Sequence, residues 1–167
     1  MFAECDLSRI LHVEVCSLFL FNVVLVEPEI PPNTGNVGRL CLATGSRLHL
    51  VKPLGFSFED RHLKRAGLDY WDEVDVRRWD SFAELKRAQS LSTRYFFLTA
   101  KSGRAYYDVK FHDRDFLVFG RETKGLPENL LAKNIDNCLT IPMQKTRSLN
   151  LATAVAIVLF EAVRQQR

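Results

Sequence analysis

The chain has 167 residues, of which 47% are hydrophobic and 26% charged, and its formal net charge is +3. That length fits a single domain with a sizeable core, and the composition is that of an ordinary globular protein. The mildly basic balance is compatible with a nucleic-acid partner but does not require one.

The four cysteines argue against a disulfide framework and against a zinc site. Cys5, Cys16, Cys41 and Cys138 form no CxxC pair, and no histidine stands at ligand spacing from them. Buried, reduced thiols are the better interpretation. We therefore expect a protein that binds no metal.

The amino-terminal stretch ends in an apolar run, VCSLFLFNVVLV, at residues 15–26. The run is too short to span a bilayer, and the start of the chain is acidic where a signal peptide has basic residues. We expect a cytoplasmic protein whose first buried strand is 21–26. Residues 1–19 then form an amino-terminal extension of unknown role.

Strand-like and helix-like segments alternate along the rest of the chain. Short apolar runs predict strands at 21–26, 47–52, 74–78, 95–99, 115–119 and 137–141. Helix-like stretches lie near 34–44, 59–67, 80–89 and 126–133, and a long last helix covers about 148–164. This alternation predicts an α/β fold, with a mostly parallel sheet flanked by helices on both faces. No linker interrupts it, so we expect residues 20–167 to form one domain.

The first loop of interest follows the first strand, because open α/β sheets bind ligands beyond the carboxyl ends of their strands. Pro31 and Pro32 are expected to keep the chain extended, Asn33 or Thr34 to cap the next helix, and Gly45 to end it. Val37, Leu40, Cys41 and Thr44 share one face of that helix. Arg39 lies roughly opposite, so it either points toward a ligand or is a solvated surface arginine.

The second loop is FGRETKGLP, residues 119–127, in which charged residues stand between Gly120 and Gly125. Glycine permits unusual backbone geometry and close approach to a ligand. The stretch is neither a Walker A loop nor a GxGxxG fingerprint. A binding site and a plain strand-to-helix turn, with Pro127 in the first turn of the helix, both remain open.

The third segment, residues 141–166, contains the last helix, for which Ser148 is the expected cap. Apolar residues cover nearly every side of this helix, and a helix that is apolar all round is buried. In a chain of this size, that pattern indicates packing on a second subunit as well as on the chain's own sheet.

These three segments together resemble the motifs of SPOUT-class RNA methyltransferases. PNTGNVGR at 32–39, FGRETKGLP at 119–127 and IPMQKTRSLNLATAVAIVLFEA at 141–162 occur in the same order and at similar spacing. The chain is most similar to the TrmL (YibK-like) subgroup, which methylates the 2′-hydroxyl of the tRNA wobble nucleotide. EPEIPPNTGN at 27–36 and the segment Lys64–Tyr70 add to this resemblance, which covers residues 21–166. It implies a carboxy-terminal trefoil knot, which ordinary folds almost never contain, and S-adenosylmethionine as the cofactor.

The resemblance also implies the residues of the site. The cofactor-binding positions would be Leu98, Gly120, Ile141 and Ser148. The catalytic set would be Asn33, Arg39, Glu122, Ser148 and Asn150.

Arg39 matches the arginine proposed to activate the ribose hydroxyl, and Asn33 and Glu122 match residues that hold this arginine and the methionine end of the cofactor. Because arginine has a pKa above about 12, we favour Arg39 as an anchor for the substrate phosphate. Transient deprotonation of Arg39 in a dry site stays open as the alternative.

RNA binding is expected to be electrostatic and sensitive to salt. The candidate RNA-binding residues are Arg61, Lys64, Arg65, Arg121, Lys124, Lys145 and Arg147. His62, Tyr70 and Trp71 are candidates for stacking on a base of a single-stranded loop. Each of them alone is more often an ordinary surface or core residue.

The implied function is 2′-O-methylation of cytidine or modified uridine at the wobble position of tRNA, with leucine tRNAs as the expected substrates. The implied partners are the tRNA anticodon stem-loop and a second copy of the chain, bound through the last helix. Phe160 stands where the subgroup often has tyrosine, and Arg121 where proline is common. Methylation of another RNA, such as rRNA, and a catalytically silent knotted RNA-binding protein are the alternatives.

Overall fold

The computed structural model describes residues 21–57 and 70–167. Six parallel strands form one sheet in the order β3-β2-β1-β5-β4-β6. They are β1 (Asn22–Val26), β2 (Arg47–Val51), β3 (Val76–Trp79), β4 (Tyr95–Leu98), β5 (Phe116–Phe119) and β6 (Cys138–Leu139). All six predicted strands and the predicted α/β class are confirmed.

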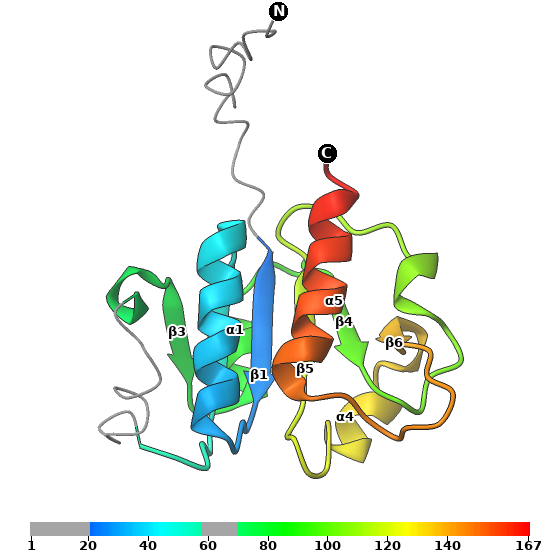
Figure 1. Cartoon of the computed structure of the whole chain (residues 1–167), viewed down its shortest axis with the longest axis horizontal. Helices are drawn as coiled ribbons and strands as arrows, with labels where there is room; N and C mark the ends of the chain where they lie inside the picture. The colour runs from blue at the N-terminus through cyan, green and yellow to red at the C-terminus, as the bar shows by residue number, and fades with distance from the viewer. Residues whose placement is uncertain (1–20, 58–69) are drawn as a thin grey trace, which may run out of the picture.

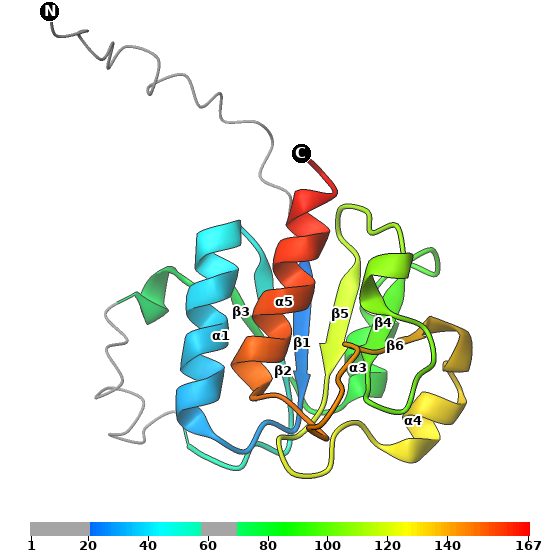
Figure 2. The ribbon, with the colours of Figure 1, turned by 45° about the vertical axis from the view of Figure 1, so that its right-hand side comes forward.

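Helices cover both faces of this sheet. They are α1 (Pro31–Thr44), α3 (Phe82–Arg87), α4 (Glu128–Ala132) and α5 (Leu151–Arg164). Single turns of 3-10 helix lie at Trp71–Glu73, Tyr106–Asp108 and Ile135–Asn137. Figure 1 shows α1 and α5 side by side in front of the sheet, and Figure 2 shows α3 behind it. The helix predicted at 59–67 lies outside the described residues.

Alternate residues of the central strands enter two separate cores, as the pleat of a strand requires. On one face Val23, Leu25 and Leu117 pack with the buried side of α1 and α5. On the other face Val24 and Val118 pack with residues of α3 and α4. The central strands are buried on both sides, which explains why they read as continuous apolar runs.

The start of α1 differs from the prediction. Pro31 and Pro32 are the first two helical residues rather than an extended segment, and Ile30 occupies the N-cap position. Asn33 and Thr34 therefore lie inside the first turn and do not cap it. Proline is well suited to the first turn because its missing N–H has no partner there in any case. Gly45 does end the helix, with φ of 66°, so that prediction is confirmed.

The start of α5 also differs, because Asn150 caps it and Ser148 does not. The Asn150 Oδ1 accepts hydrogen bonds from the backbone N–H of Ala152 at 2.9 Å and of Thr153 at 3.3 Å. Asparagine is among the preferred N-cap residues. One side of α5 is fully buried, whereas Phe160 on the outer side is 49% exposed.

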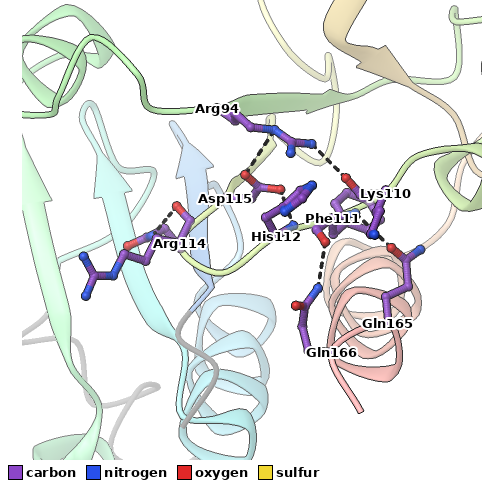
Figure 3. A network of polar contacts seen from close by, with 9 residues as sticks. Arg94, Lys110, Phe111, His112, Arg114, Asp115, Gln165 and Gln166 are labelled. Carbon is purple, nitrogen blue, oxygen red and sulfur yellow. Dashed lines mark hydrogen bonds and ion pairs between the residues drawn. The ribbon is translucent and has the colours of Figure 1, made fainter. Parts of the chain in front are cut away.

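The far end of α5 is tied to the loop that precedes β5 (Figure 3). Gln165 Oε1 accepts from the backbone N–H of Phe111 at 2.8 Å, and Gln166 Nε2 donates to the Phe111 carbonyl at 2.7 Å. In the same loop Asp115 is buried beside Arg94, 3.4 Å away, and burial raises the pKa of the Asp115 carboxyl. Both ends of the last helix are thus held by side-chain hydrogen bonds.

A chain of hydrogen-bonded polar side chains runs across β3, β2 and β1. The Trp79 indole N–H of β3 donates to His49 Nδ1 of β2 at 3.0 Å, and His49 Nε2 lies 3.0 Å from Asn22 Oδ1 of β1. Because Nδ1 accepts, the proton of His49 is on Nε2, which donates to Asn22. Burial lowers the pKa of His49 to about 3. The ring is therefore neutral and serves as a structural link between three strands.

Cys41 and Cys138 are buried and unpaired, as expected, whereas Cys5 and Cys16 lie outside the described residues. No helix in the described ranges is long and apolar enough to cross a membrane. Within those ranges, no group of His, Cys, Asp and Glu side chains is placed to hold a metal ion. The threading of the chain into a knot stays a prediction.

Candidate active site

The site lies where the strand order reverses, between the carboxyl ends of β1 and β5. β1 lies between β2 and β5 in the sheet. After β1 the chain continues to β2 on one side, and after β5 it continues toward β6 on the other side, so the chain leaves β1 and β5 in opposite directions. Such a reversal opens a crevice outside the carboxyl ends of the strands. The two loops that meet there are residues 27–30 after β1 and residues 120–125 after β5.

Glu122 connects these two loops. Its carboxylate accepts hydrogen bonds from the backbone N–H of Glu29 at 2.8 Å and of Ile30 at 3.2 Å. A third bond comes from Asn33 Nδ2 at 3.0 Å. A carboxylate at the amino end of a helix is favoured by the unpaired N–H groups and by the helix dipole. Glu122 thus anchors the loop after β5 to the start of α1.

Asn33 extends this hydrogen-bond network from Glu122 to α5. It is buried, and its Oδ1 accepts from Asn150 Nδ2 at 2.9 Å. Since Asn150 also caps α5, the chain Glu122–Asn33–Asn150 joins the loop after β5, α1 and α5. Three residues that the resemblance placed in one catalytic set are in contact.

Glu29 closes the same junction from the other side, and the sequence reasoning missed it. Its Oε2 accepts from the Thr123 hydroxyl at 2.7 Å and from the Thr123 N–H at 3.2 Å. Each loop therefore contributes one glutamate that receives hydrogen bonds from the other loop. The sequence signal was present in the acidic EPE that directly follows a buried strand.

Glu27 and Arg121 form an ion pair at the base of these loops. Glu27 has φ of 55°, a left-handed conformation that non-glycine residues seldom adopt. Arg121 was a candidate for RNA binding, and the structure instead shows its guanidinium at the Glu27 carboxylate, with the Arg121 side chain 33% exposed.

The glycines of the second motif close a tight hairpin. The backbone groups of Arg121 and Gly125 exchange two hydrogen bonds, of 3.2 and 2.9 Å. Gly125 has φ of 68°, which favours glycine. A Cβ at Gly120 would lie 2.1 Å from the carbonyl carbon of Gly125. Gly120 is therefore needed where its own loop folds back on it, and the left-handed backbone conformation in this hairpin is at Gly125.

A cavity of about 450 Å³ lies beside this hairpin. It is lined by the ends of β4 and β5, the segment after β6 and the start of α5. Leu98, Gly120, Ile141 and Ser148, the four positions expected to bind the cofactor, all line it. Small-molecule sites typically measure about 300–1,000 Å³ and are mostly apolar with a few polar groups, and this cavity fits that description.

Arg39 stands apart from this cavity, farther along α1. By the rise of a helix it lies about 9 Å beyond Asn33. The residue is exposed, and its guanidinium carbon lies 4.6 Å from the centre of the Tyr70 ring. The Tyr70 hydroxyl donates to the Gly35 carbonyl at 3.0 Å. The guanidinium of Arg39 thus stacks on Tyr70, which is itself hydrogen-bonded to α1. The proposed orientation of Arg39 by Glu122 stays a prediction.

Tyr70 and Trp71 both pack on α1, where Gly38 makes room for the Trp71 ring. A Cβ at Gly38 would lie 2.5 Å from the Trp71 ring. The two aromatic rings proposed to stack on a base thus cover the helix that carries Arg39.

The remaining predicted RNA contacts divide into two groups. Arg61, His62, Lys64 and Arg65 lie outside the described residues. Lys124, Lys145 and Arg147 are exposed, and Lys124 and Arg147 line the cavity.

Comparison with known proteins agrees with this geometry. The model of the SpoU rRNA Methylase family matches residues 20–160. A tRNA (cytidine(34)-2'-O)-methyltransferase of Polaromonas sp. is 50% identical over 149 residues, covering 87% of this chain and 91% of the relative. The enzyme of the same name from Escherichia coli K12 is 46% identical over 148 residues, covering 87% and 94%.

Two solved structures extend the comparison. One, from work on the 2-OH methylation of C/U34 on tRNA, has a TM-score of 0.84 and 46% identity, covering 89% of this chain and 97% of the other. An AdoMet-bound rRNA methyltransferase from Sinorhizobium meliloti has a TM-score of 0.77 and 26% identity, covering 88% and 57%. The family match over nearly the whole described fold decides the assignment: this chain belongs to the SpoU rRNA methylase family.

Proposed function

We propose that this protein is an S-adenosylmethionine-dependent 2′-O-methyltransferase of the wobble nucleotide of tRNA, acting in the cytoplasm. The observation that carries the proposal is the identity of 46–50% to wobble cytidine 2′-O-methyltransferases, over almost their whole length. The junction of Glu122, Asn33 and Asn150 beside a cavity of suitable size supports it.

The cavity residues fit the proposed cofactor. Leu98 and Ile141 offer apolar side chains, Gly120 offers backbone without a side chain, and Ser148 offers a hydroxyl. When bound, S-adenosylmethionine supplies a methyl group on a positively charged sulfur. Glu122, which also lines the cavity, brings the negative charge that suits a cation.

Glu122, Asn33 and Asn150 act as positioning residues in this proposal. All three hydrogen bonds received by Glu122 come from α1 or from the loop before it. Their combined effect is to hold the hairpin 120–125 against α1 and α5, which sets the shape of the cavity wall. Catalytic geometry has to be held to within about 0.5 Å, and such a hydrogen-bond network provides that rigidity.

Arg39 is proposed to hold a phosphate of the RNA next to the reacting ribose. Its guanidinium is exposed and stacked on Tyr70, a placement suited to a planar, permanently charged anchor. The proton of the 2′-hydroxyl then passes to that phosphate or to water. Transient deprotonation of Arg39 would need a dry environment, whereas an exposed side chain is surrounded by water.

We further propose that residues 20–167 form one domain that dimerises through α5. Phe160 on α5 is 49% exposed and Leu42 on the neighbouring α1 is 36% exposed. Exposed apolar side chains on two adjacent helices suit a second copy of the same surface. The carboxy-terminal knot is proposed with the rest of the family fold.

The test is mass spectrometry of nucleosides from leucine tRNA transcripts and cellular tRNA, incubated with the protein and S-adenosylmethionine. We expect 2′-O-methylcytidine or 2′-O-methyluridine in the anticodon loop, and its loss in Arg39→Ala. Arg39→Lys keeps the charge without the planar fork and should retain only part of the activity.

Other products would point to the alternatives. Methylation of ribosomal RNA alone would replace the tRNA substrate by rRNA. RNA binding without methylation of any RNA would indicate a catalytically silent binding protein and would contradict the proposal.

A further inference from the structure

A groove of about 430 Å³ lies on the face of the sheet opposite α1 and α5. Its walls are the carboxyl ends of β1 and β2, the start of α3, and α4 with the residue just before it and the turn after it. The floor is apolar, with Val26, Val51 and Leu130. None of the cofactor-binding positions proposed above belongs to it.

Three lysines from three different elements line this groove. Lys52 follows β2, Lys86 belongs to α3 and Lys133 follows α4, and all three are exposed. The fold thus gathers cationic side chains that are far apart in the sequence. Like charges brought together attract a counter-anion.

Acidic side chains neutralise only part of this charge. Lys52 pairs with Asp80 at 2.8 Å, in an exposed contact. Glu27, which also lines the groove, is paired with Arg121. Among the contacts of the described residues, Lys86 and Lys133 have no carboxylate partner, and Lys86 Nζ lies 5.9 Å from the centre of the Tyr95 ring. Two ammonium groups are therefore available to an anion.

Another cavity shows the contrast. It measures about 750 Å³ and contains Lys101 and Arg104. Lys101 is paired with Glu128 at 2.5 Å, and Arg104 donates to the Asp136 carbonyl at 3.3 Å. Both cations therefore already have partners within the protein, so that cavity offers an anion less free positive charge than the groove does.

The groove and the active site share one wall. Glu27 lines the groove and its ion-pair partner Arg121 lines the cofactor cavity. The wall stands between β1 and β5, where the strand order reverses. An RNA strand with one ribose at the active site can therefore cross this edge and place neighbouring nucleotides over the lysines.

We propose that this groove binds backbone phosphates of the RNA substrate, through Lys86 and Lys133 and with Lys52 at its margin. The inference rests on the proposed function and extends it to a second contact surface. Lysine is a point-like cation suited to phosphate, and such contacts position an RNA without reading its sequence. Asn129 and Asn134 line the same groove.

The experiment measures the dissociation constant of an unmodified leucine tRNA transcript at several salt concentrations, by fluorescence anisotropy. Lys86→Gln with Lys133→Gln should raise the constant about tenfold near 0.1 M salt. It should also make the slope of log K against log salt shallower by about 1.4, as expected for two lost contacts with a single strand. In methylation assays KM for tRNA should rise while kcat at saturating tRNA stays unchanged.

Two matched variants complete the design. Lys110→Gln with Arg114→Gln removes the same charge in the loop before β5, at the opposite end of the strands from the groove. It should change neither the dissociation constant nor its salt dependence by more than about twofold. Lys86→Arg with Lys133→Arg keeps the charge and should restore binding. All the substituted side chains are exposed, so the fold should be retained, and thermal unfolding checks this.

The outcomes separate the groove from the activity. Unchanged RNA affinity in Lys86→Gln with Lys133→Gln, or an equal loss of affinity in both charge variants, would refute the proposal that the groove binds RNA. A wild-type protein that binds tRNA but methylates none would refute the proposed function, while the variants would still decide the groove. A wild-type protein that binds no RNA would refute both.

Discussion

At the scale of single residues, Asn150 carries two separable tasks. Its Oδ1 caps α5, and its Nδ2 donates to Asn33 in the chain that leads to Glu122. Asn150→Ala should lower the free energy of unfolding by about 1–2 kcal/mol, because the cap is lost, and should also reduce methylation. Asn150→Asp keeps a capping oxygen but removes the donor, so it should retain most of the stability and still reduce methylation. Denaturant unfolding and methylation assays on both variants measure this difference, and equal stability of both would contradict the capping role.

Gly120 is the second residue whose role can be isolated. A methyl group there would lie 2.1 Å from backbone carbon, so Gly120→Ala has to open the hairpin 120–125. We expect a loss of stability of about 1–3 kcal/mol, typical of overpacking, and weaker binding of S-adenosylmethionine measured by calorimetry. Gly103 has no atom within 4 Å of its Cβ position, so Gly103→Ala is the control and should leave both quantities nearly unchanged. Wild-type cofactor affinity in Gly120→Ala would show that the hairpin does not shape the cavity.

At the scale of elements, His49 ties β1, β2 and β3 together as a neutral ring. Its pKa is lowered from 6.5 to about 3 in the folded state, mainly because burial penalises the charged form. Between these two values the unfolded chain binds more protons than the folded chain. Stability from this group is therefore fully present above pH 6.5 and is lost as the pH falls toward 3.

The expected contribution to the slope approaches 1.4 kcal/mol per pH unit, the value for one proton. Denaturant unfolding from pH 7 to pH 4 measures it, with His49→Gln as the variant in which this part of the slope disappears. Identical pH profiles of wild type and His49→Gln would mean that the ring is already charged in the folded state.

The elements also show how far local patterns reach. All six strands could be predicted from short runs of strand-forming residues, and the central strands, which are buried on both faces, read as continuous hydrophobic segments. The beginnings of α1 and α5 could not, since several residues in each segment can cap a helix. Pro31 and Pro32 form the first turn of α1, and Asn150, whose amide also reaches Asn33, caps α5 in place of Ser148.

At the scale of the whole molecule, the exposed apolar surface on α5 and α1 leads to a prediction about assembly. Phe160→Glu places a charge at the centre of the proposed interface and should shift the protein from dimer to monomer in light scattering coupled to size exclusion. Exposed Leu91, a large apolar residue elsewhere, serves as control, and Leu91→Glu should leave the mass unchanged. A wild-type protein that is monomeric at micromolar concentration would refute the dimer.

The sequence by itself determined the parallel sheet, its six strands and the three motifs that indicate the family. These signals are local, since hydrophobic periodicity and turn residues act within one or two turns of chain. Only the tertiary structure decided which side chains meet. Glu122 is 89 residues from Asn33, and Asn33 is 117 residues from Asn150. They come together because the strand order reverses between β1 and β5. The fold likewise brings together the groove lysines from three separate elements. No periodicity in a chain specifies contacts of that separation, because they follow from how the strands are ordered in the sheet.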